Sequence, residues 1–212
     1  MEKNGRLVLA RHHESEWNKL GLWTGLRDRH LTDYGFAKSE EMGLAIKDIH
    51  IDEAFASMLV RSIETLSSML NAMGQYGVPE KYSSALNERS YGDYTGKDKW
   101  EMLKLVGKDK WDDIRRAWDC PVPNGETLKM VYERVLPYFM ENILPPIVRG
   151  ETVLVVAHGN SCRSLMKYME NISDEGIKNV EMPFGAIYIY ELDATGHMIK
   201  KEERIVQSTV NA

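Results

Sequence analysis

Short apolar blocks recur along the chain and predict six strands. The blocks are rich in branched and aromatic side chains, as is typical of buried strands. They are residues 7–10, 53–57, 81–87, 152–157, 186–192 and 198–206. The last two are separated by Thr195-Gly196, which predicts a hairpin near the end of the chain.

The segments between these blocks carry apolar residues at helical spacing or alternate charges. They predict helices over residues 31–49, 59–74, 97–107, 108–118, 127–148 and 161–171. We expect Thr32 to cap the first helix and Gly74 to end the second. Pro137 lies inside the fifth predicted helix and is expected to kink it.

Alternating strands and helices predict a three-layer α/β/α fold with a mostly parallel central sheet. No repeat, linker or low-complexity tract divides the chain, so we expect one domain over residues 1–212. In such folds ligands bind at the carboxyl ends of the strands. Two of the predicted strands end there on Arg11-His12 and on His158.

Composition narrows the function classes. The chain has 43% apolar and 28% charged residues, which is ordinary for a globular protein, and its net charge of −5 does not favour nucleic-acid binding. Cys120 and Cys162 are too few for a disulfide framework and lack metal spacing. No apolar run reaches the roughly 20 residues of a membrane span, and the amino-terminal segment does not resemble a signal peptide. We therefore expect a cytoplasmic protein that binds no membrane.

The two strand-end histidines are the main candidates for chemistry. A lone histidine in this position is usually structural, but Arg11 and Asn18 near His12 are donors that suit phosphate. His158 is followed by Gly159, which allows close backbone approach, and by Asn160, which can open a helix whose amides favour an anion. If the two imidazoles converge, one can attack phosphorus and the other can stabilise charge on the oxygens.

Several charged residues can be interpreted in two ways. Arg61 lies in the first turn of a predicted helix, where a cation is disfavoured unless an anion is bound nearby. Glu88 directly follows a predicted strand, and it is either a surface carboxylate or a general acid and base. Lys99, Arg115 and Arg116 belong either to solvated helix faces or to a clamp for carboxylate groups.

Common catalytic motifs are missing from the sequence. There is no HxxxH or HExxH pattern, so we expect no metal. There is also no GxxxxGK[ST] or GxGxxG motif for nucleotide phosphates, and no GxSxG elbow of a serine hydrolase.

Six motifs in this order resemble one family. They are RHHESEWN, WTGLRDRHLTDYG, LVRSIETL, LNERSYGDYTG, IRRAW and AHGNSCR. From residue 7 to about residue 205 the chain resembles the cofactor-dependent phosphoglycerate mutases of the histidine phosphatase superfamily. The resemblance implies interconversion of 3-phosphoglycerate and 2-phosphoglycerate, primed by 2,3-bisphosphoglycerate and without a metal. The implied partners are small phosphorylated three-carbon acids.

The resemblance also implies roles for single residues. His12 resembles the histidine that becomes phosphorylated, and Glu88 resembles the proton donor and acceptor. The residues that resemble the phosphate pocket are Arg11, Asn18, Arg61, His158, Gly159 and Asn160. Those that resemble the phosphoglycerate-binding positions are Thr24, Gly25, Arg89, Tyr91, Lys99, Arg115 and Arg116.

Three departures from the family pattern matter. His13 stands where the family has glycine, and its side chain is expected either to crowd the phosphate or to donate to it. The segment between Trp118 and Glu126 is short, which leaves a monomer or a dimer as alternatives. Little chain follows the last predicted strand, so we expect a more open site in which water can reach a phosphorylated His12.

Two other functions therefore remain as alternatives. The first is a phosphatase that acts on small phosphoesters or on 2,3-bisphosphoglycerate, which an open site and His13 would favour. The second is a binder of anionic ligands in which His13 has disabled the nucleophile. The retained Lys99 and the Arg115-Arg116 pair favour the mutase.

Overall fold

A computed structural model describes residues 4–209. Residues 1–3 and 210–212, which belong to the predicted domain, lie outside the described residues. Six strands form one sheet in the order β3-β2-β4-β1-β5-β6. Their bounds are β1 Gly5–Arg11, β2 Glu53–Ser57, β3 Glu80–Ser83, β4 Thr152–Ala157, β5 Ala186–Leu192 and β6 Met198–Ile205. The first four strands of that order are parallel, whereas β5 is antiparallel to β1 and β6 is antiparallel to β5.

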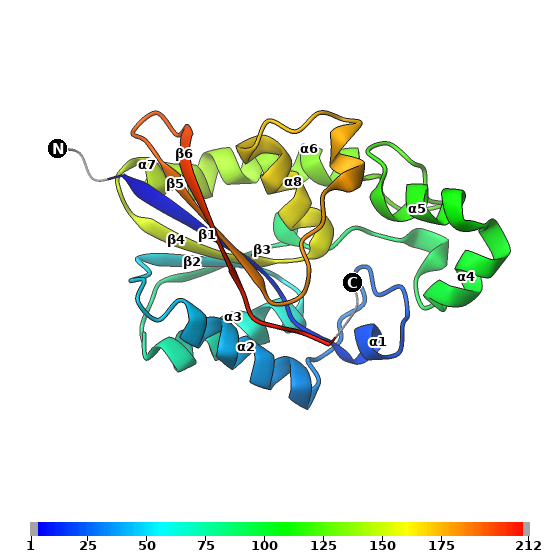
Figure 1. The fold of residues 1–212 in the computed structure, drawn as a ribbon, viewed down its shortest axis with the longest axis horizontal. Helices are drawn as coiled ribbons and strands as arrows, with labels where there is room; N and C mark the ends of the chain where they lie inside the picture. Colours follow the sequence, from blue (N-terminus) through cyan, green and yellow to red (C-terminus); the bar gives the residue numbers. More distant parts are fainter. Residues whose placement is uncertain (1–3, 210–212) are drawn as a thin grey trace.

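Helices cover both faces of this sheet (Figure 1). On one face lie α2 (Asp33–Ala45) and α3 (Val60–Met73), and on the other lie α6 (Leu128–Tyr138), α7 (Leu144–Val148) and α8 (Gly159–Met169). The predicted three-layer fold with a mostly parallel sheet is confirmed, and so is the terminal hairpin of β5 and β6. In the part of the chain that the structure describes, every helix is too short or too polar to traverse a lipid bilayer.

Successive side chains of β1 point to opposite faces of the sheet and contribute to two separate cores. Leu7 and Leu9 pack with the side chains of α6 and α8, whereas Val8 and Ala10 pack with those of α2 and α3. All four are fully buried, as expected for a central parallel strand that is covered on both sides. Helices α2 and α3 approach closely because Gly43 has no side chain; a Cβ there would lie 2.3 Å from the Met69 carbonyl oxygen.

Local differences from the predicted elements have identifiable causes. The third predicted strand stops at Ser83, whose hydroxyl accepts from the Ala85 amide and turns the chain into a 3₁₀ segment, Ser84–Leu86. After Pro137 the long predicted helix changes into a π-helical turn, Phe139–Ile143, before α7. The last predicted helix begins earlier than expected, because His158 takes the N-cap position and Gly159-Asn160 form the first turn of α8.

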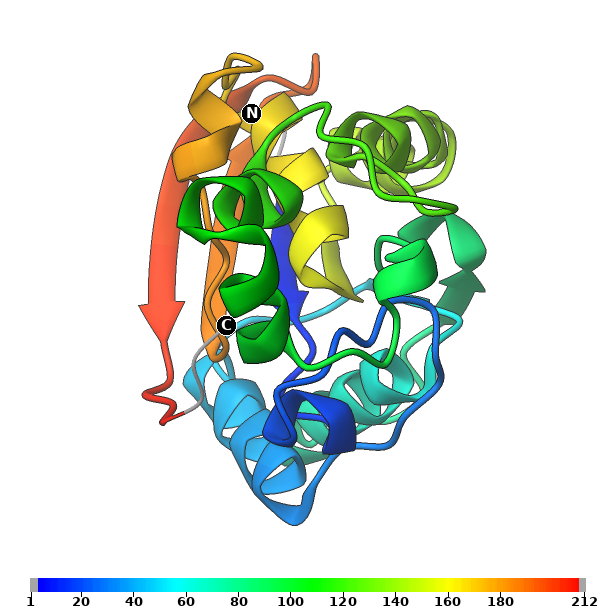
Figure 2. The same cartoon turned by 90° about the vertical axis from the view of Figure 1, so that its right-hand side faces the viewer.

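The two charged helices, α4 (Lys99–Val106) and α5 (Lys108–Arg116), extend beyond the carboxyl ends of the parallel strands (Figures 1 and 2). They enclose a small core of their own, to which the loop at residues 22–25 contributes Trp23. Trp111 and Ile114 of α5 are buried in it. This arrangement places α4 and α5 next to the carboxyl ends of β1 and β4, which His12 and His158 follow directly in the sequence.

Candidate active site

The two predicted histidines lie side by side at the strand ends. The pairing of β1 with β4 continues one residue beyond the strands, since the His12 amide donates to the Ala157 carbonyl at 2.9 Å. The ring centroids of His12 and His158 are 4.8 Å apart. The predicted convergence of the two imidazoles is therefore what the structure shows.

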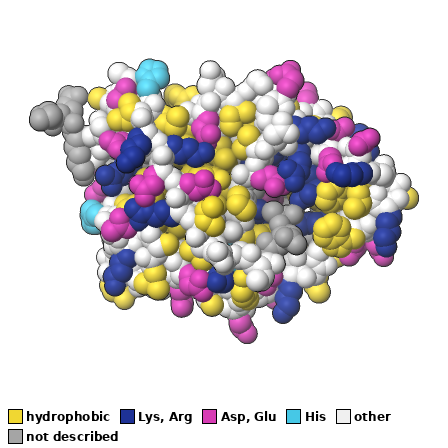
Figure 3. Space-filling view, viewed as in Figure 1, with side chains coloured by type: hydrophobic (Ala, Val, Ile, Leu, Met, Phe, Trp, Pro, Cys, Tyr) yellow, Lys and Arg dark blue, Asp and Glu magenta, His cyan; other side chains and the backbone are white. Residues whose placement is uncertain are grey.

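A cavity of about 750 Å³, counted out to its open mouth, lies beside this pair. Six cationic side chains and two carboxylates line it, although the chain as a whole carries a net charge of −5. The cations are Arg11, Arg61, Lys99, Arg115, Arg116 and Arg163, and the carboxylates are Glu88 and Glu181. In Figure 3, Lys and Arg side chains lie close together on the right-hand part of the surface, where α4 and α5 lie in Figure 1. The cavity is therefore suited to a ligand with several negative charges.

Hydrogen bonds define the tautomer of His12. Its Nδ1 lies 2.6 Å from the carbonyl oxygen of His13, which can only accept, so Nδ1 carries the proton. Arg61 Nε donates toward Nε2 at 3.4 Å, which leaves a lone pair on Nε2. Burial, together with Arg61 and Arg11, holds the pKa of His12 well below its ordinary value. The imidazole is thus neutral, with its unprotonated nitrogen available as a nucleophile.

Several buried polar atoms around the cavity have no protein partner among the described residues. Arg11 Nε, Trp23 Nε1 and Thr24 Oγ1 belong to residues that line the cavity, and His158 Nδ1 belongs to the ring beside His12. The other ring nitrogen of His158 lies 2.7 Å from Ser57 Oγ, which orients the ring. Arg61 is fixed by the carbonyls of Gly25 and Arg27 at 2.8 and 2.9 Å. Unpartnered buried polar atoms are costly unless a ligand satisfies them, and Arg11 Nε, which can only donate, suits an anion.

Glu88 is held with one oxygen fully engaged. Its Oε1 accepts from the Arg89 amide at 2.8 Å, the Asn160 amide at 3.3 Å and Asn160 Nδ2 at 3.0 Å. No partner of Oε2 is recorded among the described residues. A Cβ placed on Gly159 would lie 3.7 Å from Oε2 and 3.6 Å from Arg11 Cζ, so this oxygen faces the cavity beside Arg11.

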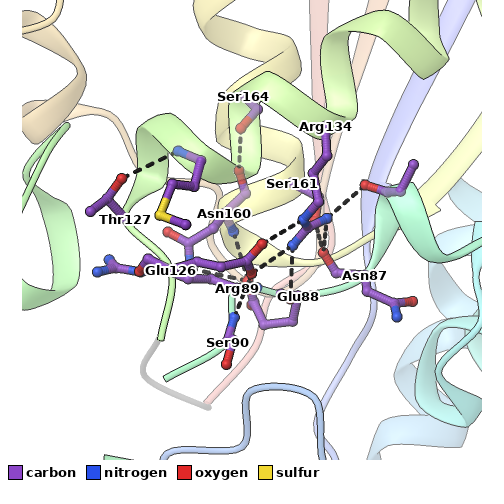
Figure 4. A network of polar contacts seen from close by, with 12 residues as sticks. Asn87, Glu88, Arg89, Ser90, Glu126, Thr127, Arg134, Asn160, Ser161 and Ser164 are labelled. Atoms are coloured by element: carbon purple, nitrogen blue, oxygen red, sulfur yellow. Dashed lines mark hydrogen bonds and ion pairs between the residues drawn. The ribbon is translucent and has the colours of Figure 1, made fainter. Parts of the chain in front are cut away.

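The loop that carries Glu88 rests on an ion pair behind it (Figure 4). Arg134 of α6 donates to both carboxylate oxygens of Glu126, at 2.8 and 3.0 Å, and also to the carbonyls of Asn87 and Glu88. Glu126 in turn accepts from the Ser90 amide at 2.8 Å. This pair fixes the backbone on both sides of Glu88, and hence the position of its carboxylate.

Lys99, Arg115 and Arg116 also line the cavity. Arg115 lies over the Trp111 ring, with Cζ 4.2 Å from its centroid, and Arg116 pairs with Glu181. Burial, with help from Arg11 and Arg115, lowers the pKa of Lys99 to about 8. These three side chains therefore lie at the cavity and not only on solvated helix faces.

Most of the remaining predicted site residues also line the cavity: Asn18, Thr24, Gly25, Tyr91, Gly159 and Asn160. Arg89 does not. Its guanidinium is buried and donates to the carbonyls of Glu126, Ile114 and Cys120. The family resemblance implied a binding role for Arg89, but these hydrogen bonds hold its guanidinium away from the cavity.

The histidine that replaces the family glycine does not enter the cavity. The His13 ring is buried between Tyr34 and Phe184, at centroid distances of 5.6 and 5.5 Å. Its Nδ1 accepts from the Glu14 amide at 2.8 Å, and its φ is not positive. The two effects expected of His13, crowding the phosphate or donating to it, are therefore both wrong for this side chain.

His13 makes the stability of the fold depend on pH. Burial, with Arg11 and Lys38 nearby, lowers its pKa from 6.5 to about 4. The unfolded chain therefore takes up this proton first, and the free energy of unfolding falls as the pH decreases from 6.5 to 4. Burial also holds the pKa of His12 and the pKa of His158 well below their ordinary value, so these two residues likewise reduce the free energy of unfolding as the pH decreases.

We expect His13→Gly to show a smaller loss of stability on acidification than the wild type. The difference in the free energy of unfolding between pH 7 and pH 4.5, measured with urea, should be roughly 2–3 kcal/mol smaller in the variant than in the wild type. The phosphoryl-transfer rate should not rise, because the ring does not line the cavity. A variant with wild-type acid sensitivity, or with faster transfer, would contradict this view of His13.

Five residues of the cavity wall are not among the predicted site residues: Leu22, Trp23, Arg163, Glu181 and Met182. Trp23 and Arg163 belong to the motifs WTGLRDRHLTDYG and AHGNSCR, but nothing in the sequence indicates that their side chains are buried at the site. Glu181 and Met182 lie in the loop before β5, and the Met182 carbonyl accepts from Arg11 Nη1 at 2.9 Å. No motif marks that loop.

Comparison with known proteins agrees with this geometry. Residues 7–203 match the model of the histidine phosphatase superfamily, branch 1. The chain belongs to the histidine phosphatase superfamily. It is 44% identical over 198 residues to a 2,3-bisphosphoglycerate-dependent phosphoglycerate mutase of Parvibaculum lavamentivorans, which covers 92% of this chain and 94% of the relative. A protein of the same name from Rhodopseudomonas palustris is 44% identical over 197 residues, covering 92% and 95%. The resemblance to the cofactor-dependent mutases is thereby confirmed.

Two solved structures share the fold of this chain. A mycobacterial glucosyl-3-phosphoglycerate phosphatase superposes with a TM-score of 0.79 at 17% identity, over 98% of this chain and 100% of the other. The α-ribazole phosphatase of Shigella flexneri gives a TM-score of 0.76 at 21% identity, over 96% of each chain.

Proposed function

We propose that this protein is a 2,3-bisphosphoglycerate-dependent phosphoglycerate mutase. It interconverts 3-phosphoglycerate and 2-phosphoglycerate through a phosphohistidine on His12. The observation that carries this proposal is the neutral His12, whose unprotonated Nε2 faces a cationic cavity next to His158. The mutases that resemble this chain at 44% identity support it over a phosphatase.

The residues present fit a molecule with two phosphates and a carboxylate. Arg11 Nε, Thr24 Oγ1 and His158, in the tautomer with the proton on Nδ1, offer donors for one phosphate next to His12. Lys99, Arg115 and Arg116 offer cations for the groups at the other end of the cavity. When bound, 2,3-bisphosphoglycerate supplies the phosphoryl group that primes the enzyme.

Each group then has a defined task. His12 Nε2 attacks phosphorus in line with the leaving oxygen, while Arg61, Arg11 and His158 stabilise charge on the phosphoryl oxygens. The carbonyl of His13 keeps the proton on Nδ1 and favours the positive charge that the imidazole acquires. Glu88 Oε2 gives a proton to the leaving alkoxide and takes one from the hydroxyl that later attacks the phosphohistidine.

An assay that follows two products tests the proposal. The protein is given 3-phosphoglycerate with a trace of 2,3-bisphosphoglycerate, and 2-phosphoglycerate and inorganic phosphate are measured together. We expect 2-phosphoglycerate with little phosphate. Phosphate alone would identify a phosphatase, and the absence of both products would identify a non-catalytic binder.

The charge of Lys99 predicts a pH dependence of substrate capture. With a pKa of about 8, Lys99 is cationic below pH 8 and neutral above it, so it loses its attraction for the substrate as the pH rises. We expect kcat/KM for 3-phosphoglycerate to fall about tenfold between pH 7.5 and pH 9. Lys99→Arg should flatten this alkaline limb, because the guanidinium does not titrate there. An unchanged limb in that variant would assign the titration to another group.

The setting of the enzyme is also part of the proposal. We propose that residues 1–212 act as one domain in the cytoplasm, as a monomer or a dimer, on small phosphorylated three-carbon acids. The cationic cavity supports small phosphorylated acids as partners, and the single six-stranded sheet supports one domain.

A further inference from the structure

Arg163 lies in the wall of the cavity, and the proposed reaction gives it no task. It lies on α8 one turn after Asn160 and is only 5% exposed. Its guanidinium donates to five acceptors from three parts of the chain. These are the carbonyls of Arg115 (3.4 Å), Arg116 (2.7 Å), Ile177 (2.7 Å) and Val180 (2.8 Å), and Asn160 Oδ1 (3.1 Å).

The contact with Asn160 differs from the other four because it selects between two orientations of an amide. Arg163 has only donors, so the amide oxygen of Asn160 must face it. The amide nitrogen then faces Glu88 Oε1 and the Tyr91 hydroxyl, each at 3.0 Å. With the amide reversed, Oδ1 would face the Glu88 carboxylate, and two acceptors would repel each other. The tyrosine hydroxyl can donate as well as accept, so it does not select an orientation.

The orientation of Asn160 matters because it determines which oxygen of Glu88 is available. Asn160 supplies two of the three donors on Oε1, from its backbone and from its side chain. In Figure 4 Asn160 lies next to Glu88, and the loop that carries Glu88 is hydrogen-bonded to Arg134 and Glu126. With Oε1 saturated, Oε2 stays directed toward Arg11 and the cavity.

We propose that Arg163 is a positioning residue: by fixing the amide of Asn160 it keeps Glu88 Oε2 aimed at the substrate hydroxyl. The inference rests on the proposed function, since it concerns the proton transfer of that reaction. A purely structural Arg163 would tie α5 and the loop at residues 177–180 to α8 without affecting proton transfer. The two roles predict different results.

A double-mutant cycle separates them. We expect Arg163→Lys to lower kcat about tenfold or more, because a misaimed carboxylate transfers the proton poorly. In the Asn160→Ala background, where no amide remains to be oriented, the same change should lower kcat less than twofold. Equal factors in both backgrounds would overturn the proposal.

Arg204→Lys is the matched control: Arg204 also joins two elements through the Ala45 carbonyl and Asp48, but outside the cavity. It should leave kcat unchanged.

A second variant does not depend on the folding of Arg163→Lys. Asn160→Asp keeps an acceptor for Arg163 but puts a second acceptor against Glu88 Oε1, which imitates the reversed amide. The Glu88 carboxyl should then hold its proton more tightly than in the wild type. We therefore expect kcat to fall and the acidic limb of kcat/KM to move to higher pH. The other titratable groups around Glu88 are unchanged in this variant: Arg11, Arg61, Tyr91, Lys99 and Cys162. A wild-type kcat and acidic limb would refute the proposal.

The wild type measured in parallel keeps the two proposals apart. If it does not interconvert the phosphoglycerates, the proposed function is wrong. If it does, and the Arg163 effect is the same with and without the Asn160 amide, only the positioning role is wrong.

Discussion

Replacing His12 with glutamine should abolish phosphoryl transfer, with kcat lowered by at least about 10⁴-fold. Glutamine fills a similar volume and can still donate to the His13 carbonyl, but its amide cannot carry a phosphoryl group. The direct measurement is labelling with 2,3-bisphosphoglycerate that carries radioactive phosphorus. The wild type should acquire a label that acid removes and alkali does not, and His12→Gln should acquire none.

The control for this experiment is an exposed histidine outside the cavity. His30 pairs with Glu64 at 2.6 Å and its side chain is 67% exposed. His30→Gln should be labelled like the wild type. An acid-labile label that persists on His12→Gln would show that another residue is the nucleophile, and the assignment of His12 would have to be withdrawn.

Replacing Glu88 with glutamine should lower kcat by roughly 10²–10⁴-fold, the usual contribution of a general acid and base. The amide is nearly isosteric and remains within reach of Asn160, so KM should change little. The loss arises because an amide cannot exchange a proton with the substrate hydroxyl. Steady-state kinetics in both directions, at the pH optimum of the wild type, would measure it.

Glu14 provides a matched control for Glu88. Both residues are 8% exposed, but Glu14 accepts from Thr32 Oγ1 at 2.6 Å and does not line the cavity. Glu14→Gln should lower thermal stability and leave kcat within about twofold. If Glu88→Gln retained a kcat as high as that of Glu14→Gln, proton transfer would have to be assigned elsewhere.

The sequence predicted much of the fold because strand and helix signals are local. The block at residues 53–57 became β2 with the same bounds, and Thr32 and Gly74 cap the helices that they were expected to cap. These outcomes depend on alternation, capping and backbone conformation within a few residues. The predicted strand at residues 81–87 was partly wrong because the hydroxyl of Ser83 competes with the sheet for the backbone amides.

The sequence alone also determined which side chains stand at the ends of the strands. The apolar runs before Arg11-His12 and before His158 stop where the sheet stops, so both histidines had to lie at the carboxyl edge. Whether they meet depended on β1 and β4 being neighbours in the sheet, and only the tertiary structure decided this.

The direction of the long polar side chains was likewise decided by tertiary structure. Glu88 and Arg89 are adjacent in the sequence, yet one faces the cavity and the other is buried among backbone carbonyls. His13 turns into a gap between Tyr34 and Phe184, and Arg163 finds acceptors on α5 and on the loop before β5. A hydrogen-bond partner far along the chain leaves no local pattern, because its position depends on how the layers pack and not on the spacing of neighbouring residues.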